Sequence, residues 1–361
     1  MDSDQAASLL KKSGYDLNVI TLIPEGRSHD VFDVSLSDGR SVVARFGKHS
    51  PEGQPRRDFH YNGVLSLERE NYLCHFVRAA GLPAPKVEST HLLSEQEFVV
   101  VEKLPGKHWK TFLEEKGYSQ QAYLDSLEFL GADLAQAHQV TFDYFGNLMA
   151  GGVIEPAGVT NFALRLRSIL DLKIGREEKT NALSPQELME VKQYFTSRLD
   201  NLYPLFERLK STPRLILTDL HPMNFLVDDA GKPSGYFDLE FCQAGHPALE
   251  MYYLEVQLFN YFNRNTAALA RDAFYKGYRK SGGEYEPDDP INKELETILA
   301  AGQTLTAVTA YHGVRDGVRD RWSAQFKEIL FDVITSGSMD TVAYADVIRQ
   351  KTQQPSQPTL P

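Results

Sequence analysis

The sequence predicts an α+β protein of two lobes, in which an antiparallel sheet with one helix precedes a mainly helical lobe. Three observations lead to this prediction. The first hundred residues contain short apolar stretches with the alternation typical of strands, separated by turn residues. Pro105-Gly106 then interrupts the pattern, and the apolar residues after it recur mostly at helical spacing. The length of 361 residues is also more than one compact core usually takes.

Five strands and one helix are expected in the first lobe. The stretch 31–36 shows the period-two alternation of a strand, and the turn at 37–39 connects it to the next strand as a hairpin. Apolar residues recur at helical spacing over 66–80, and the Gly- and Pro-containing stretch 81–85 ends that helix. The expected strands are 19–23, 31–36, 41–46, 87–93 and 97–102. We therefore predict a first lobe over residues 1–104.

The second lobe, residues 105–351, is expected to be mainly helical. Apolar residues between Leu124 and Ala137 lie on one helical face. One stretch, 215–238, differs, because short apolar segments there flank a polar loop of the kind that commonly carries functional residues. Further long helices are expected near 186–210, 248–280 and 291–331. The Pro- and Gln-rich residues 352–361 are expected to form a disordered tail.

Composition and charge limit the classes of function. Hydrophobic residues make up 42% and charged residues 24% of the chain, which is typical of a soluble globular protein. Cys74 and Cys242 lie far apart, so neither a zinc site nor a disulfide framework is indicated. Asp and Glu outnumber Lys and Arg by 49 to 38, a net charge of −11, which argues against a nucleic-acid partner. The acidic charge favours a neutral or cationic small substrate.

No targeting or membrane segment is indicated by the sequence. The N-terminal residues lack the basic start and apolar run of a signal peptide. No stretch approaches the roughly 18 apolar residues that a membrane span needs. We therefore expect a cytoplasmic protein with no membrane partner, and the oligomeric state stays open.

Three polar residues in and after the 215–238 loop match the needs of phosphoryl transfer. Asp219 and Asn224 are five residues apart across a Pro-containing turn, and Asp238 follows at the end of an expected strand. In phosphoryl transfer one carboxylate orients the attacking hydroxyl and takes its proton, while an amide oxygen and a second carboxylate hold Mg²⁺ against the nucleotide phosphates. Because Asp and Asn also stabilise ordinary turns, each residue alone has an equally simple structural explanation.

The segment TDLHPMNFLVDDAGKPSGYFDLEF, residues 218–241, resembles the aminoglycoside phosphotransferase and choline kinase-like family. The family reads His-Gly-Asp-Leu-His-Pro-Gly-Asn and then Ile-Asp-Trp-Glu. The matching residues here are Asp219, Leu220, His221, Pro222, Asn224, Asp238 and Glu240. The resemblance extends over about residues 18–260 and implies the two-lobed protein-kinase-like fold. It also implies ATP and Mg²⁺ as cofactors, with Asp219 as the catalytic residue and Asn224 and Asp238 as metal ligands.

The resemblance further implies nucleotide-binding residues in the first lobe. Arg45 aligns with the strand residue, usually Lys in protein kinases, that holds the α- and β-phosphates, and Glu70 aligns with its helix partner. An Arg fork can bind phosphate through two hydrogen bonds, whereas Lys acts as a compact charge. Both residues could instead be solvated surface charges.

Two weaker correspondences complete the expected nucleotide site. Gly26 lies in a stretch, 24–30, that is expected to turn over the phosphates, although a simple hairpin turn explains a single Gly equally well. Glu102, Lys103 and Leu104 correspond to the hinge and are expected to contact adenine through their backbone. Side-chain identity matters little for such contacts.

The sequence departs from the family pattern in the catalytic loop. The family's His and Gly before the catalytic Asp are Leu217 and Thr218 here, and Leu217 could replace the His by apolar packing. Glu250 could supply the carboxylate that braces the loop, although a solvated Glu at a helix start is an equally good explanation. His221 is expected to support the turn rather than to take part in proton transfer.

The expected function is transfer of the γ-phosphate of ATP to a hydroxyl of a small molecule, such as an aminoglycoside-like or other aminated or hydroxylated metabolite. The alternative is a weakly active or inactive nucleotide-binding pseudokinase, which Leu217 and Thr218 favour. A kinase acting on protein hydroxyls is disfavoured, because no Asp-Phe-Gly activation segment is present. Asp316 and Asp320 could receive a cationic acceptor, but the neighbouring arginines suggest a self-paired surface. The acceptor itself stays open, since fold does not fix substrate.

Overall fold

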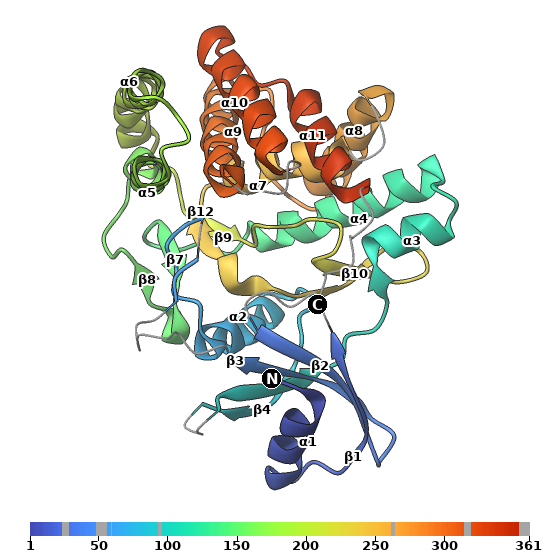
Figure 1. The fold of residues 1–361 in the computed structure, drawn as a ribbon. Helices are drawn as coiled ribbons and strands as arrows, with labels where there is room; N and C mark the ends of the chain where they lie inside the picture. Colours follow the sequence, from blue (N-terminus) through green and yellow to red (C-terminus); the bar gives the residue numbers. More distant parts are fainter. Residues whose placement is uncertain are drawn as a thin grey trace.

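The protein has two lobes in the computed structural model, which describes residues 1–23, 29–47, 56–58, 60–92, 96–260, 264–313 and 319–353. A five-stranded antiparallel sheet forms most of the first lobe, and helices make up most of the second (Figure 1). Helix α2 (Leu67–Ala79) lies between that sheet and the helical lobe. This arrangement confirms the α+β, two-lobed fold class predicted from the sequence.

All five predicted strands of the first lobe are present. Their order in the sheet is β1-β2-β3-β5-β4, and every neighbouring pair is antiparallel. Arg45 is paired with Val31 on one side and with Val99 on the other, so its strand is the central one. The strands are β1 (Leu17–Ile23), β2 (His29–Leu36), β3 (Ser41–Gly47), β4 (Val87–His91) and β5 (Phe98–Glu102).

The two faces of this sheet are covered by different helices. Residues such as Phe46 and Val100 form a core with Leu10 of helix α1 (Ser3–Lys12). Val99 and Val101 form a smaller cluster with Leu67 of α2, against which Val43 also packs. Successive side chains of a strand point to opposite faces, so Arg45, two residues after Val43, faces α2. The alternation of β3 thus aims the arginine at the helix between the lobes.

Helix α1 was not expected from the sequence. It is only ten residues long, and short helices are stable mainly through tertiary packing, which here is the burial of Ala6 and Leu10 against the sheet. One local signal is present, a capping box in which Asp2 accepts from the backbone N–H of Gln5 and Gln5 accepts from that of Asp2.

Two small sheets of the second lobe carry the loop that the sequence singled out. One has the order β11-β10-β6 and the other β8-β7-β12-β9. The loop leaves the second sheet after β9 and enters the first at β10, so it connects the two. The strands are β6 (Lys107–His108), β7 (Gly146–Leu148), β8 (Ile154–Glu155), β9 (Arg214–Ile216), β10 (Phe225–Val227), β11 (Pro233–Tyr236) and β12 (Gln243–Gly245). Short 3₁₀ turns are η1 (Ala150–Gly152) and η2 (Leu239–Phe241).

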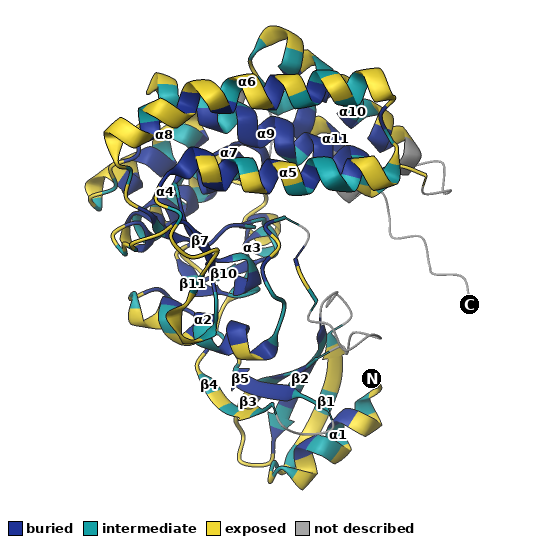
Figure 2. Ribbon diagram, turned by 90° about the vertical axis from the view of Figure 1, so that its left-hand side faces the viewer, coloured by how far each residue is buried: buried dark blue, intermediate teal, exposed yellow. Residues whose placement is uncertain are grey.

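The helices of the second lobe enclose the largest hydrophobic core, which is dark blue in Figure 2. They are α3 (Trp109–Glu115), α4 (Gln120–Ala137), α5 (Phe162–Thr180), α6 (Pro185–Leu209), α7 (Ala248–Leu254), α8 (Arg264–Lys280), α9 (Pro290–Tyr311), α10 (Arg319–Ser336) and α11 (Thr341–Gln353). The contact between α4 and α8 is extensive, and α9 packs against α10 and α7. Residues 354–361 of the predicted tail lie outside the described residues.

Two predicted long helices are each divided in the structure. The 248–280 stretch begins as α7, continues as a π-helical segment, η3 (Glu255–Phe259), and resumes as α8. Asn260 ends the first part, because its side-chain amide donates to the backbone carbonyl of Glu255 at 2.5 Å. The 291–331 stretch is divided after Tyr311, and Gly313 follows with φ +67°, a conformation that favours glycine.

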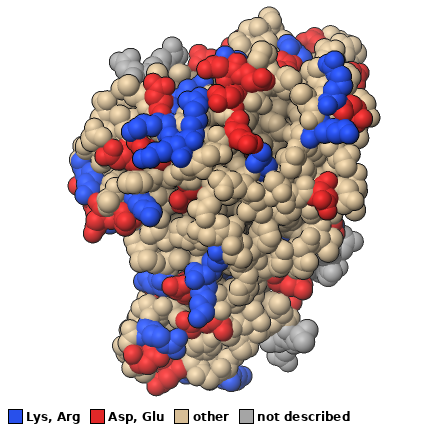
Figure 3. Space-filling model, turned by 180° about the vertical axis from the view of Figure 1, so that it is seen from behind, with Lys and Arg blue, Asp and Glu red and all other residues tan. Residues whose placement is uncertain are grey.

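Charges of both signs are interspersed on the surface that Figure 3 shows, where Lys and Arg lie beside Asp and Glu. Ion pairs of the second lobe include Arg167 with Asp200 and Lys192 with Glu178, both at 2.6 Å. Within the described ranges, no helix is long and apolar enough to cross a membrane.

Candidate active site

The loop between β9 and β10, residues 217–224, has an unusual backbone. Thr218 and Asp219 both have positive φ angles, +53° and +47°, in the left-handed region that non-glycine residues rarely adopt. Asp238, after β11, has φ +58°. Strained conformations of this kind persist only where the surroundings hold them, and they cluster at functional sites. Two of the three residues singled out from the sequence are therefore held in such conformations.

The Asp219 side chain is held by hydrogen bonds to both of its carboxylate oxygens. The side-chain amide of Asn224 donates to Oδ2 at 3.1 Å and to the backbone carbonyl of Asp219 at 2.9 Å. The hydroxyl of Tyr253, on α7, donates to Oδ1 at 2.6 Å. Burial first, and then the charge of Asp219, raise the pKa of Tyr253 well above its ordinary value. Tyr253 therefore stays protonated and acts as a donor.

Asn224 and Asp238 lie at the same end of a strand pair. Phe225 is paired with Tyr236, and the N–H of Phe237 donates to the Asn224 carbonyl at 3.4 Å, which places Asn224 beside the residue before Asp238. Both hydrogen bonds of the Asn224 amide nitrogen go to Asp219, so the amide oxygen is the group available to a cation. An amide oxygen and a carboxylate are oxygen ligands of the kind Mg²⁺ takes, with nucleotide phosphates and water completing the shell.

A magnesium site of this type is compatible with the rest of the structure. The described residues contain no cluster of three or more His, Cys, Asp or Glu that could hold a metal alone. A site that uses one carboxylate, one amide and the phosphates of a bound nucleotide needs no such cluster. The donor set of Asn224 and Asp238 therefore fits the expected ion.

The expected phosphate-binding pair of the first lobe is assembled. Arg45 on β3 forms an ion pair with Glu70 on α2, and both side chains are largely buried. A second nitrogen of Arg45 lies 3.9 Å from Asp238 of the other lobe and 3.3 Å from Nδ1 of His29. His29 lies 4.0 Å from Glu70 as well. The arginine thus connects the sheet, α2 and the predicted metal ligand.

Glu250 braces the 217–224 loop from α7. Its Oε1 accepts from the backbone N–H groups of Leu217 at 2.6 Å and Thr218 at 3.1 Å. Its Oε2 lies 2.6 Å from Nε2 of His138, whose other ring nitrogen lies 2.7 Å from the Tyr278 hydroxyl. Glu250 is 1% exposed. Glu250 therefore braces the loop, as one of the two interpretations of the sequence suggested. The other interpretation, a solvated Glu at a helix start, is wrong.

The two departures from the family pattern have structural substitutes. Leu217 is buried in the main core of the second lobe, as apolar packing requires. The Thr218 hydroxyl donates to the backbone carbonyl of Phe241 at 2.9 Å, which links the 217–224 loop to the segment after Asp238. His221 accepts at Nδ1 from the N–H of Met223 at 3.2 Å, the turn-supporting contact expected from the sequence.

The expected hinge follows β5 directly. Glu102 is the last residue of the strand and is paired with Val42 of β3, while Lys103 and Leu104 lie beyond the strand. Lys103 is tied to Asp33 by an ion pair of 2.6 Å. Across the described ranges, the backbone of Lys103 and Leu104 makes no hydrogen bond to other backbone groups. That backbone can therefore pair with a ligand.

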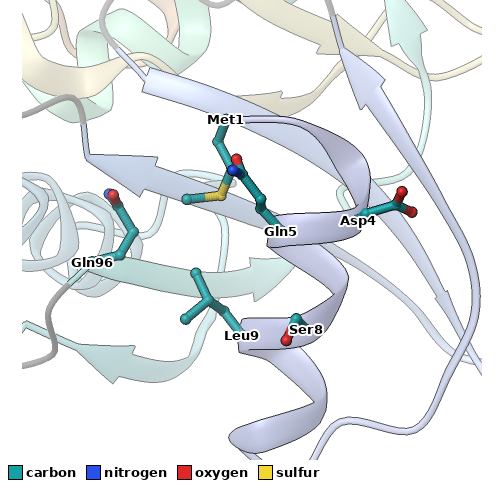
Figure 4. Close-up of a pocket in the computed structure, with 6 residues that line it drawn as sticks. All are labelled: Met1, Asp4, Gln5, Ser8, Leu9 and Gln96. Atoms are coloured by element: carbon teal, nitrogen blue, oxygen red, sulfur yellow. The ribbon is translucent and has the colours of Figure 1, made fainter.

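Some predicted residues cannot be placed in the site. Gly26 lies outside the described residues, as does Asp316, and the side chain of Asp320 is not described. A hollow of about 580 Å³ is lined by Met1, by residues of α1 and by Gln96 (Figure 4), and none of the predicted site residues lines it. A much smaller hollow, of about 10 Å³, is lined by Tyr253 and by other uncharged residues such as Val256, Gln303 and Tyr344.

Four contributing residues were not identified as site residues from the sequence. Tyr253 and His29 contact predicted site residues directly, and His138 supports Glu250. Arg69 of α2 donates to the carbonyls of Leu148, Glu240 and Cys242 in the second lobe, at 2.6, 2.5 and 3.2 Å. Only the position of Arg69 beside Glu70 offered a local signal. The other contacts depend on segments that lie far apart in the sequence.

Comparison with known proteins adds independent findings to this geometry. A model of the Phosphotransferase enzyme family matches residues 19–290. A macrolide 2'-phosphotransferase from Brachybacterium faecium has a similar structure, with 16% identity, a TM-score of 0.52 and 98% of each chain covered. A candidate fructosamine-3-kinase from Thermobifida fusca is 15% identical with a TM-score of 0.57, covering 92% of this chain and 97% of the other. A search of curated proteins gives no match. At these identities the structural likeness establishes the protein-kinase-like fold alone.

Proposed function

The chain belongs to the Phosphotransferase enzyme family, and from this premise we propose that it transfers the γ-phosphoryl group of ATP to a hydroxyl of a small molecule. The observation that carries the proposal is the assembly around Asp219. Asn224 holds that carboxylate directly, and Asp238 lies within 3.9 Å of the first-lobe arginine Arg45. Residues from both lobes thus meet at one place.

In the proposed reaction Asp219 accepts a hydrogen bond from the acceptor hydroxyl and orients its oxygen toward the γ-phosphorus. A new oxygen–phosphorus bond forms, the bond between the γ-phosphorus and the bridging oxygen of ADP breaks, and the hydroxyl proton passes to Asp219. An ordinary carboxylate suffices as the base, because in a loose transition state the proton leaves late. Positioning and charge neutralisation account for most of the rate.

Arg45, Asn224 and Asp238 are proposed to hold the phosphate end of ATP. When bound, Mg²⁺ supplies positive charge that neutralises the β- and γ-phosphates, with Asn224 and Asp238 as its protein ligands. Arg45, fixed by Glu70, would supply a second positive charge from the first lobe. The guanidinium fork can bind a phosphate through two hydrogen bonds.

The backbone of Glu102, Lys103 and Leu104 is proposed to contact the adenine, with Gly26 near the phosphates. We also propose residues 1–104 as the nucleotide-binding lobe and 105–351 as the catalytic and acceptor-binding lobe. A cytoplasmic location is part of the proposal, because ATP is the substrate. The acceptor is proposed to be a small hydroxylated molecule, and its class is the open part of the function.

The pseudokinase alternative rests on Leu217 and Thr218. Against it stand the contacts that replace the family's His and Gly, since Glu250 holds both N–H groups and the Thr218 hydroxyl reaches Phe241. A loop held in this way has the order that phosphoryl transfer requires. These contacts support an active enzyme over a protein that only binds nucleotide.

The test is ADP release from Mg-ATP across a panel of hydroxylated metabolites and antibiotics, for the natural protein and Asp219→Asn. We expect at least one acceptor to stimulate turnover, and the variant to lose about 10²- to 10⁴-fold in kcat, the usual contribution of a general base. The variant should keep the ATP-induced rise in Tm. If no acceptor stimulates turnover above Asp219→Asn while ATP still raises Tm, the pseudokinase alternative holds instead.

A further inference from the structure

Tyr253 contacts the Asp219 carboxylate more closely than Asn224 does. Its hydroxyl lies 2.6 Å from Oδ1, whereas the Asn224 amide lies 3.1 Å from Oδ2. The tyrosine and the aspartate are 34 residues apart and meet only through packing of α7 against the loop. A charged acceptor makes such a hydrogen bond shorter and stronger than one between neutral groups.

One helical turn of α7 holds three consecutive loop residues. Glu250 accepts from the N–H groups of Leu217 and Thr218, and Tyr253, three positions later on the same face, binds the side chain of Asp219. The same helix therefore fixes both the backbone that carries the carboxylate and the direction of the carboxylate. Asp219 has φ +47°, so its side chain starts from a backbone conformation that needs such support.

From these contacts we propose that Tyr253 is a positioning residue for phosphoryl transfer, which fixes the rotation of the Asp219 carboxylate so that it meets the acceptor hydroxyl. This inference rests on the proposed function. A carboxylate can accept about four hydrogen bonds, so the bonds from Tyr253 and Asn224 are compatible with one from an acceptor.

A purely structural role for Tyr253 makes a different prediction. Its ring lies 6.2 Å from that of Tyr252, and Phe would preserve this packing. If the ring alone matters, Tyr253→Phe leaves catalysis unchanged. If the hydroxyl positions Asp219, the same variant loses rate because a misdirected carboxylate no longer orients the acceptor.

The experiment measures kcat and KM of Tyr253→Phe with the best acceptor of the panel, and the slower hydrolysis of Mg-ATP by water. We expect kcat to fall about tenfold to a hundredfold in both assays, with the acceptor KM changed by less than about threefold. The ATP-induced rise in Tm should stay as in the natural protein.

Tyr285→Phe is the matched control. Tyr285 is buried and donates to the carboxylate of Glu296 at 2.6 Å, the same length as the bond from Tyr253 to Asp219. Its hydroxyl contacts none of the predicted site residues, and its backbone hydrogen bond to the Tyr278 hydroxyl is kept in the Phe variant. This variant should lose stability and keep kcat. An equal loss of kcat in both variants would mean that the effect is a general consequence of a lost buried hydrogen bond, and the inference would fail.

A double-mutant cycle separates positioning from folding. If Tyr253 acts through Asp219, Tyr253→Phe should have little further effect on kcat in the Asp219→Asn background. Additive losses would overturn the inference while leaving the proposed function intact. If the natural protein itself turns over neither with an acceptor nor with water, the proposed function fails, and the inference fails with it.

Discussion

Helices α2 and α7 hold opposite sides of the candidate site by different kinds of contact. α2 acts through charged side chains, since Glu70 pairs with Arg45 and Arg69 donates to backbone carbonyls of the second lobe. α7 acts on a turn of backbone, since Glu250 accepts from two N–H groups and Tyr253 fixes one carboxylate. The proposed nucleotide side thus depends on charged side chains, and the Arg45 guanidinium there could bind a phosphate while Glu70 holds it. The side of Asp219 is held by hydrogen bonds, from the Tyr253 hydroxyl to its carboxylate and from two loop N–H groups to the Glu250 carboxylate.

The comparison predicts that changes in α2 affect mainly ATP binding and that changes in α7 affect mainly the rate. Four variants test this division, starting with the largest expected effect.

Arg69→Met should have the largest effect. Arg69 is 1% exposed, and its removal leaves carbonyls of Val64, Leu148, Glu240 and Cys242 without their charged donor. We expect a loss of about 3–5 kcal/mol in the free energy of unfolding, as when a buried charged network is broken. The helix that carries Glu70 would lose its anchor, so ATP should bind more weakly. Urea unfolding and ATP titration measure the two effects.

Arg78→Met provides the control for that variant. Arg78 lies on the same helix, and its exposed side chain pairs with Glu102 and donates to the carbonyl of Ala84, so it does not reach the second lobe. Surface ion pairs contribute little, so the expected loss is under about 1 kcal/mol. Comparable losses for the two variants would show that α2 is not anchored through Arg69.

Glu250→Ala should come next, with a loss of about 2–4 kcal/mol, because two backbone N–H groups and a ring nitrogen of His138 lose their buried acceptor. The remaining folded protein should lose kcat and keep its ATP affinity, since Arg45 and Glu70 are untouched. Glu250→Gln retains one acceptor oxygen, so its stability and its kcat should lie between those of Glu250→Ala and the natural protein. A fall in ATP affinity without a fall in kcat would contradict the division between α2 and α7.

Arg45→Lys should weaken ATP binding about tenfold, which corresponds to loss of one charge-assisted hydrogen bond of about 1.5 kcal/mol. Lys keeps the positive charge and loses the planar fork. The effect should appear in the KM for ATP, with a smaller change in kcat. Arg40→Lys, at an exposed position just before β3, should change neither constant. Equal KM values for the natural protein and Arg45→Lys would exclude Arg45 from the phosphate site.

Thr218→Gly should have the smallest effect on stability, under about 1 kcal/mol. Glycine relieves about 1–2 kcal/mol of left-handed strain at this position. Two effects oppose this gain, because the hydroxyl bond to Phe241 is lost and glycine gives the unfolded chain more conformational entropy. Thr218→Val keeps the strain and loses only the hydroxyl bond, so it should be less stable than Thr218→Gly. Thermal unfolding of the pair checks the order, and the reverse order would show that the backbone at residue 218 is not strained.

Much of the fold could be predicted because its signals are local. The alternation in 31–36 and 41–46 gave the central strands, and the same alternation aims Arg45 at α2. Helix α1 was missed because its stability comes from the burial of Ala6 and Leu10 against a sheet formed elsewhere. The divided helices were missed because apolar spacing continues across Asn260 and Gly313, where side-chain hydrogen bonding and a positive φ end the helix.

By itself, the sequence determined the choice of Asp219, Asn224 and Asp238 as the proposed trio, since their spacing along one short segment is what phosphoryl transfer would require. Only the tertiary structure decided what holds that trio in place. Tyr253 meets Asp219 across 34 residues, and Arg69 meets Glu240 across 171. Such contacts form only when separate helices pack on one core. Periodicity and spacing describe only residues that are neighbours along the chain, so they do not reveal these contacts.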